Sequence, residues 1–188
     1  MDADAALFGD ALGCDERLPI AFSVDPFDTG AAAAQALGLL RALALIDEPR
    51  DGEREECDPQ TAELARIEAK VDLLLNLFGA MLRERQPVLP STAVRWSRIG
   101  ARFLTAAAPP STSGLLRILP DARLPQVLEL PARLIATRTE AEGVTVWARF
   151  DALDTALEAA LERHVFSRHR RQIALARRAA AAQAPLAR

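Results

Sequence analysis

The chain of 188 residues is 50% hydrophobic and 26% charged, with a formal net charge of -3 at pH 7. This length fits one domain, or one domain with an appended element. The composition excludes the disordered and membrane-protein classes, and so small a net charge does not indicate a general nucleic-acid binder.

The amino terminus does not resemble an export signal. The segment MDADAALFGD is acidic where a secretory leader would be basic, and it lacks a continuous apolar core. No later stretch reaches the roughly 18 to 20 uninterrupted apolar residues that a membrane-spanning helix needs. Cys14 and Cys57 are separated by 42 residues, which fits neither a disulfide framework nor a zinc site. We therefore expect a cytoplasmic protein without membrane insertion.

The first elements are expected to be a strand and a helix. Apolar residues alternate with others from Leu18 to Val24, which is typical of a half-buried strand. Residues 30–46 are rich in Ala and Leu and are predicted to form a helix. Residues 47–58 contain seven carboxylates with a proline and a glycine, so they are expected to form a solvated linker.

Residues 59–85 carry the clearest periodicity of the chain. Asp58 and Pro59 are a good helix start. The apolar residues that follow recur at spacings of 3, 4, 3, 4 and 3, as at the a and d positions of a coiled coil: Leu64, Ile67, Val71, Leu74, Phe78 and Met81. The alternative is an ordinary amphipathic helix packed on its own domain, because the repeat spans only about two and a half heptads.

The positions beside this stripe favour self-association. Leu75 and Leu82 fall at e positions and Leu77 at a g position, where a two-stranded coil would place charges. A helix in a larger bundle contacts two neighbours and buries such flanks. Leu64 at a with Ile67 at d is also a pairing associated with more than two strands. We predict a homo-tetramer, with a dimer as the alternative.

The rest of the chain reads as short strands followed by a helix. Alternation from Thr92 to Leu104 slips in phase near Ser97, which predicts a bulge or turn there. Further strands are expected at 115–119, 126–137 and 143–150. We expect an antiparallel barrel or sandwich. The final helix starts at Asp151, is capped by Asp151 or Asp154, and is expected to close the barrel. Its apolar face holds Leu153, Leu157, Leu161 and Val165.

The order of these elements resembles a PilZ domain, the bacterial cyclic di-GMP receptor module. The resemblance rests on VRWSRIGARFL, LELPARLIAT, a strand GVTVWARF that ends at Phe150, and the basic helix LDTALEAALERHVFSRHRRQ. It implies an α+β fold: a small antiparallel β-barrel formed by residues 17–24 and 88–175 together with a closing helix. The helical insertion would occupy residues 29–85, and residues 176–188 would be a flexible tail.

The resemblance also implies a ligand motif, D/NxSxxG, which this chain matches only in part. The segment Arg95-Trp96-Ser97-Arg98-Ile99-Gly100 is the best alignment. Ser97 and Gly100 match the motif, whereas Arg95 stands where the family has Asp or Asn. The polar contact with the dinucleotide expected of that first position is therefore lost.

The second family motif, RxxxR, lies before the first barrel strand and binds phosphate and guanine groups of the dinucleotide with Arg forks. By letters, Arg50 to Arg54 and Arg98 to Arg102 fit it, but such spacing arises by chance in an arginine-rich chain. Carboxylates surround the first pair, and Arg17 alone precedes the first strand. We expect little or no binding of cyclic di-GMP and no other cofactor.

Other chemistry finds no support in the sequence. His164 and His169 are five positions apart on one helix and do not converge on a metal, so both are expected on the surface. No nucleophile elbow, P-loop or dinucleotide-binding glycine pattern is present. We therefore predict that the protein is not an enzyme.

The segment from Arg163 to Arg178 holds six arginines and two histidines and no carboxylate. Cations near the end of a helix are favoured by its dipole, and this is one explanation. An acidic protein partner and nucleic acid are the alternatives. Three functions therefore stand: an oligomeric adaptor that works through protein partners in type IV pilus function, motility or virulence; a cyclic di-GMP receptor with an altered motif; and a nucleic-acid binder that uses this helix.

Overall fold

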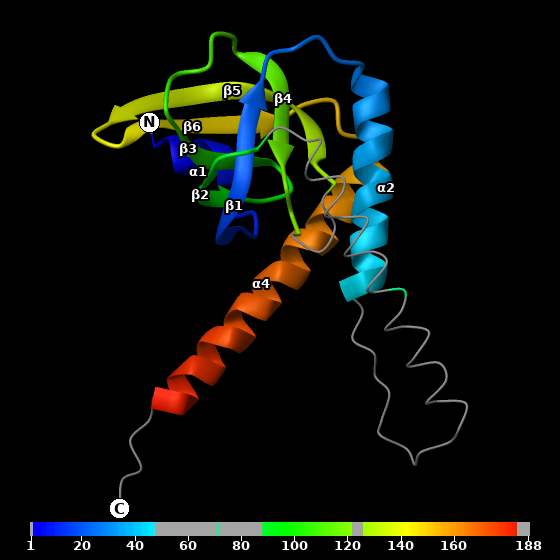
Figure 1. The fold of residues 1–188 in the computed structure, drawn as a ribbon, viewed down its shortest axis with the longest axis vertical. Helices are drawn as coiled ribbons and strands as arrows, with labels where there is room; N and C mark the ends of the chain where they lie inside the picture. Colours follow the sequence, from blue (N-terminus) through cyan, green and yellow to red (C-terminus); the bar gives the residue numbers. More distant parts are fainter. Residues whose placement is uncertain (1, 48–70, 72–87, 122–125, 184–188) are drawn as a thin grey trace, which may run out of the picture.

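The computed structural model describes residues 2–47, 71, 88–121 and 126–183. A six-stranded antiparallel barrel forms its centre, with a short helix on the barrel wall and two long helices beside it (Figure 1). In chain order the elements are α1 (Ala3–Phe8), β1 (Cys14–Ser23), α2 (Thr29–Asp47), β2 (Ser91–Trp96), β3 (Gly100–Thr105), β4 (Ser113–Ile118), β5 (Leu128–Glu140), β6 (Gly143–Phe150) and α4 (Thr155–Gln183).

The barrel closes in the order β1-β2-β3-β6-β5-β4. β1 closes it by pairing with two neighbours: residues 14–19 pair with β2, and residues 20–23 pair with β4. The predicted antiparallel barrel is thus confirmed, and the sandwich is excluded. The strands are not a simple meander, however, because β3 lies beside β6 and not beside β4.

The predicted strands are confirmed with shifted ends. β1 begins four residues earlier than expected, at Cys14, and it ends at Ser23. Val24 was expected on the buried face but is exposed, because the chain turns at Asp25, whose amide donates to the Ser23 hydroxyl. The phase slip near Ser97 is a turn that separates β2 from β3. Helix α1 was not predicted from the sequence at all.

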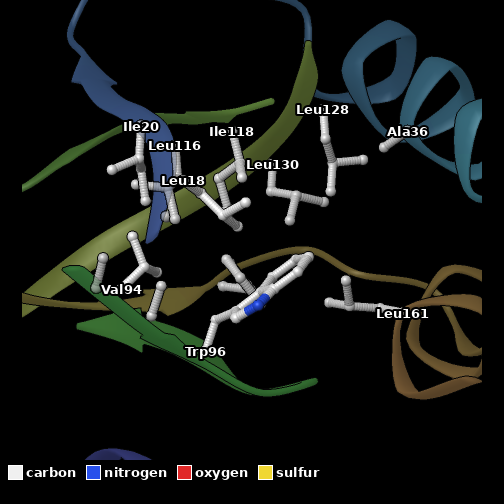
Figure 2. Close-up of a cluster of buried hydrophobic side chains, with 14 of the residues drawn as sticks. Leu18, Ile20, Ala36, Val94, Trp96, Leu116, Ile118, Leu128, Leu130 and Leu161 are labelled. Carbon is white, nitrogen blue, oxygen red and sulfur yellow. The ribbon is translucent and has the colours of Figure 1, made fainter. Parts of the chain in front are cut away.

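The interior of the barrel is apolar (Figure 2). The side chains on the inward faces of the strands fill this interior. Leu161 of α4 and Ala36 of α2 lie at one end of the barrel in Figure 2. Both helices therefore cover this end together, where we expected α4 alone. The largest fully buried side chains include Trp96, Phe103, Ile20, Leu116, Ile118, Leu128, Leu130, Leu157 and Leu161.

Helix α4 begins at Thr155, four residues later than the predicted start at Asp151, so Leu153 lies before it. Of the two predicted caps Asp154 is the one observed, because its carboxylate accepts a hydrogen bond from the Leu157 amide at 2.7 Å. The helix continues to Gln183, past residue 176, where we expected a flexible tail. Alanine-rich sequence favours this extension, since alanine has the highest helix propensity. Within the residues that the structure describes, no helix is long and apolar enough to cross a membrane.

Candidate functional site

Ser97, a predicted ligand residue, lies in the turn between β2 and β3. Its side chain is fully buried, and its hydroxyl accepts a hydrogen bond from the Ile99 amide at 3.0 Å. The Ser97 amide donates to the Gly100 carbonyl at 2.9 Å. Ser97 is therefore engaged by its own turn.

Gly100 is required by close packing between β3 and β6. A Cβ atom on this residue would lie 2.3 Å from the Ala148 carbonyl oxygen and 2.8 Å from a methyl carbon of Leu7. The first contact is with backbone, which cannot move aside as a flexible side chain can. The glycine that matches the family motif thus has a structural reason to be there.

Arg95, the third predicted ligand residue, is held by the segment at the start of the chain. Its guanidinium lies 3.6 Å from the Asp15 carboxylate and stacks over the Phe8 ring, with 5.2 Å to the ring centroid. Asp15 is also its cross-strand partner in β1. The buried Nε atom of Arg95 has no hydrogen-bond partner among the described residues.

A cavity of about 650 Å³ lies next to Arg95, between α1 and the strands of the barrel wall. Two of its arginines have a carboxylate partner: Arg95 lies near Asp15, and Arg102 donates to the Asp4 carboxylate at 2.5 Å. Arg138 stacks over the Trp147 ring at 5.1 Å. The charged lining consists of four arginines and five carboxylates: Arg17, Arg95, Arg102, Arg138, Asp2, Asp4, Asp15, Glu16 and Glu140. The cavity therefore offers little net positive charge to a phosphate.

Helix α1 owes its position to Asp4. This carboxylate bridges Arg102 of β3 and the indole nitrogen of Trp147 in β6, the latter at 2.6 Å. Leu7 and Phe8 bury their side chains against Trp147 in a second, small core. In addition, Arg149 donates to the Ala6 carbonyl at 2.8 Å. Of these residues, Asp4, Arg102 and Trp147 also line the cavity.

A largely buried polar network joins the barrel to α4. The Trp96 indole donates to Glu16 Oε1 at 2.7 Å, and Arg168 donates through Nε to Glu16 Oε2 at 2.8 Å. Arg168 also donates to the Pro120 carbonyl at 2.6 Å. The Glu16 and Arg168 side chains are only 10% and 19% exposed. Because the two charges compensate each other away from water, this pair should fix the direction in which α4 leaves the barrel.

His164 was predicted on the surface, and that prediction is wrong. The side chain is buried, and its ring meets the Trp96 ring edge-on with centroids 5.6 Å apart. His164 falls three residues after Leu161, on the face of α4 that packs on the barrel. His169 is partly exposed.

Cys14 lies beside this network and is fully buried. Burial, followed by the nearby Glu16 carboxylate, raises the pKa of its thiol to about 12. The residue is a free cysteine and is therefore a neutral, unreactive thiol at physiological pH. Among the described residues, no group of His, Cys, Asp and Glu side chains could hold a metal ion.

The remaining predicted sites lie partly outside the described residues. Arg50 and Arg54 are among those outside, as is every oligomerisation residue except Val71, which is helical and 47% exposed. Of the other arginine pair, Arg98 lies 3.6 Å from Glu162 and Arg102 binds Asp4, so each has its own carboxylate. Those oligomerisation residues outside are Leu64, Ile67, Leu74, Leu75, Phe78, Met81 and Leu82.

Sequence reasoning missed Glu16, Arg168 and Asp4. A signal existed for Glu16, because it shares the inward period of β1 with Cys14 and Leu18, and an inward carboxylate predicts a buried partner. Asp4 gave no signal, since its partners lie far along the chain.

Known proteins resemble this chain in sequence and structure. The family model described as "Atypical PilZ domain, cyclic di-GMP receptor" matches residues 40–178. A solved structure of a pathogenic protein from Xanthomonas campestris is 39% identical, with a TM-score of 0.74 over 92% of this chain and 95% of that one. That protein is described as a tetrameric PilZ domain self-assembled through an unusual helical bundle. No curated protein matches the chain.

Proposed function

Because this chain belongs to the atypical PilZ domain family, we propose that it is a non-enzymatic signalling adaptor that works through protein contacts and binds little or no cyclic di-GMP. One observation carries the proposal: the polar groups at the family's D/NxSxxG positions are engaged inside the fold. Arg95 is held by Asp15 and Phe8, and the Ser97 hydroxyl is held by its own turn. A dinucleotide would have to displace these contacts before it gained its own.

The charge of the neighbouring cavity supports the same proposal. Arginine forks bind phosphate well when they are free to turn both N–H groups toward it. Here Arg102 is already bound to Asp4, and Arg95 lies against Asp15. Carboxylates outnumber arginines in the lining, so a dinucleotide would meet repulsion as well as attraction.

The adaptor is proposed to self-associate through the heptad stripe of residues 59–85, preferably as a tetramer. The broad apolar stripe needs more than one neighbour to cover its flanks. The relative from Xanthomonas campestris, described as a tetramer built on a helical bundle, supports this number of chains. Val71, at an a position, is 47% exposed in the single chain, which leaves it available to a neighbouring copy.

Light scattering with size-exclusion chromatography tests the assembly. We expect a mass near four times the 20.4 kDa of one chain. Leu74→Glu places a carboxylate in the stripe and should dissociate the assembly, whereas Asn76→Glu, at an outward f position, adds the same charge and should leave the mass unchanged. Native Trp fluorescence from the barrel shows that both variants still fold. A wild-type mass of one chain at every concentration would contradict the assembly.

The process regulated is proposed from the family resemblance: type IV pilus function, motility or virulence. Deletion of the coding region in the native cell should impair one of these, and a copy carrying Leu74→Glu should fail to restore it. Full restoration by that variant would mean that the assembly is not needed for signalling.

A cyclic di-GMP receptor with altered contacts is the second candidate. The buried Nε atom of Arg95, which lacks a hydrogen-bond partner among the described residues, favours it, because a ligand in the adjacent cavity could supply an acceptor. Thermal unfolding separates the two candidates, since a ligand that binds the folded state raises the melting temperature. We expect no rise with cyclic di-GMP, and a clear, saturable rise would favour the receptor.

A further inference from the structure

The C-terminal half of α4 runs away from the barrel (Figure 1). From Arg163 onward the helix carries a regular stripe on the side opposite its buried face. An α-helix turns by about 100° per residue, so residues spaced by 3 and 4 share a face. The face toward the barrel holds Leu157, Leu161 and Val165, which are buried. The opposite face holds an alternation of basic and apolar residues, called here the outer stripe: Arg163, Phe166, Arg170, Ile173 and Arg177.

The apolar members of the outer stripe are left in water. Phe166 is 51% exposed and Ile173 is 40% exposed. The guanidinium of Arg170, which lies between them in sequence, stacks over the Phe166 ring at 5.9 Å. An exposed phenylalanine and isoleucine at a seven-residue spacing occupy the d positions of a heptad whose a positions are arginines.

The arginines of the outer stripe have no countercharge among the residues that the structure describes. From Arg163 to Gln183 the chain contains no carboxylate. Arg163, Arg170 and Arg177 form no ion pair with any residue that the structure describes. The helix dipole does not explain their placement, because its effect is confined to the last turn and Arg163 and Arg170 lie well before it.

The alternation indicates what can cover this face. A second copy of α4 would bring two arginine-rich stripes without a carboxylate together, and the like charges repel in either orientation of the helices. A membrane-surface helix separates its apolar face from its basic face, whereas here the two kinds of residue share one stripe. Phosphates of nucleic acid would pair with the arginines but would leave Phe166 and Ile173 without apolar contacts.

We propose that the outer stripe is a docking surface for one helix of a partner protein, with carboxylates opposite Arg163, Arg170 and Arg177 and apolar side chains opposite Phe166 and Ile173. The two helices would form a heterotypic two-stranded coiled coil, whose charged a positions select the partner and exclude self-pairing. This inference rests on the proposed adaptor function and names the chemistry of its partner.

A designed peptide serves as the probe. It is a helix of about three heptads with Glu at the positions facing the arginines and Leu at those facing Phe166 and Ile173. A matched peptide carries Lys in place of Glu. Fluorescence anisotropy with the full chain should show binding of the Glu peptide, weakened by salt, and no binding of the Lys peptide.

Charge exchange gives the decisive variant. Arg170→Glu should weaken the Glu peptide about tenfold or more, because it turns an attraction into a repulsion, and it should create binding of the Lys peptide. Arg178→Glu makes the same charge change on the same helix but off the outer stripe, and it should leave both affinities within about twofold. Phe166→Ala should weaken the Glu peptide without creating binding of the Lys peptide.

Several results would overturn the inference. The first is that the Glu peptide does not bind, and the second is that Arg170→Glu and Arg178→Glu weaken it equally. The third is that the chain binds phosphatidylglycerol vesicles or a short DNA duplex more strongly than the peptide, and that Arg170→Glu abolishes this binding. A tetrameric chain that binds neither the peptide nor cyclic di-GMP would overturn this inference but not the adaptor proposal. A monomeric chain that binds both the peptide and cyclic di-GMP would overturn the adaptor proposal but not the docking surface.

Discussion

The arginines of the barrel wall and those of the outer stripe have opposite surroundings. Arg95 and Arg102 lie beside Asp15 and Asp4, at 3.6 and 2.5 Å. Arg170 and Arg177 have no such carboxylate among the described residues. The D/NxSxxG alignment and the RxxxR spacing had suggested Arg95 and Arg102, respectively, as possible ligand residues. A carboxylate partner among the described residues separates the arginines that are engaged within the chain from those that are available to a partner protein.

The largest effect should come from removing a carboxylate that holds a largely buried arginine. Glu16→Ala leaves the Arg168 guanidinium without its partner and the Trp96 indole without its acceptor. We expect a loss of about 3 kcal/mol in the free energy of unfolding, as measured in urea.

An exposed pair provides the matched control for this substitution. Asp151 and Arg133 lie 3.1 Å apart at the surface, and Asp151→Ala should cost less than about 1 kcal/mol. Similar losses for Glu16→Ala and Asp151→Ala would mean that burial does not distinguish the two pairs.

Gly100→Ala tests whether the motif glycine serves the barrel. The added methyl would collide with the Ala148 carbonyl, so we expect destabilisation by about 2 kcal/mol. Gly38→Ala is the control, because a Cβ there meets no atom within 4 Å and lies inside α2. That substitution should stabilise the protein by roughly 0.5 to 1 kcal/mol. If Gly100→Ala leaves the free energy of unfolding unchanged, close packing does not explain the glycine at this position.

Cys14 makes stability depend on alkaline pH. Its pKa is about 12 in the folded state against 9.0 for the ordinary thiol, so between these values the unfolded chain binds fewer protons. Stability should therefore fall as pH rises above 9, by about 1.4 kcal/mol per pH unit.

Few other groups titrate in this range, since the chain has no tyrosine and Lys70 is its single lysine. Unfolding in urea at pH 8.0 to about 10.5 should show the slope in the wild type and in Cys57→Ser, and a flat dependence in Cys14→Ala. If stability still falls with pH at the same rate in Cys14→Ala, a group other than the Cys14 thiol causes the pH dependence.

The smallest effect on stability is expected at Arg95. Arg95→Asn restores the residue type that the family places first in its motif and removes a partly exposed ion pair. The free energy of unfolding should fall by less than about 1 kcal/mol. A loss of several kcal/mol would show that Arg95 is a central support of the fold.

Local patterns were sufficient to predict the strands and the long helices. Alternation through β6 and helical spacing from Leu157 to Val165 both correspond to buried faces in the structure. His164 could have been placed correctly, because it follows Leu161 by three residues. The prediction weighed only its distance from His169, and so it missed the ring packed on Trp96.

Contacts between distant segments could not be predicted from those patterns. Phe8 and Asp15 hold Arg95 from the beginning of the chain, and helix α1 is too short to give a periodic signal. The closure of the barrel between β1 and β4 likewise depends on pairing that no local pattern specifies. The partial D/NxSxxG motif could therefore be found from the sequence. That Arg95 and Ser97 are engaged by other residues of the chain could be seen only in the structure.

Calorimetric titration of the wild-type chain with cyclic di-GMP tests the central claim most directly. If Arg95, Ser97 and Arg102 are committed to internal contacts, the nucleotide should give no binding heat beyond dilution. A dissociation constant of about 1 µM or tighter would contradict the account, because it would require these groups to be available to the ligand.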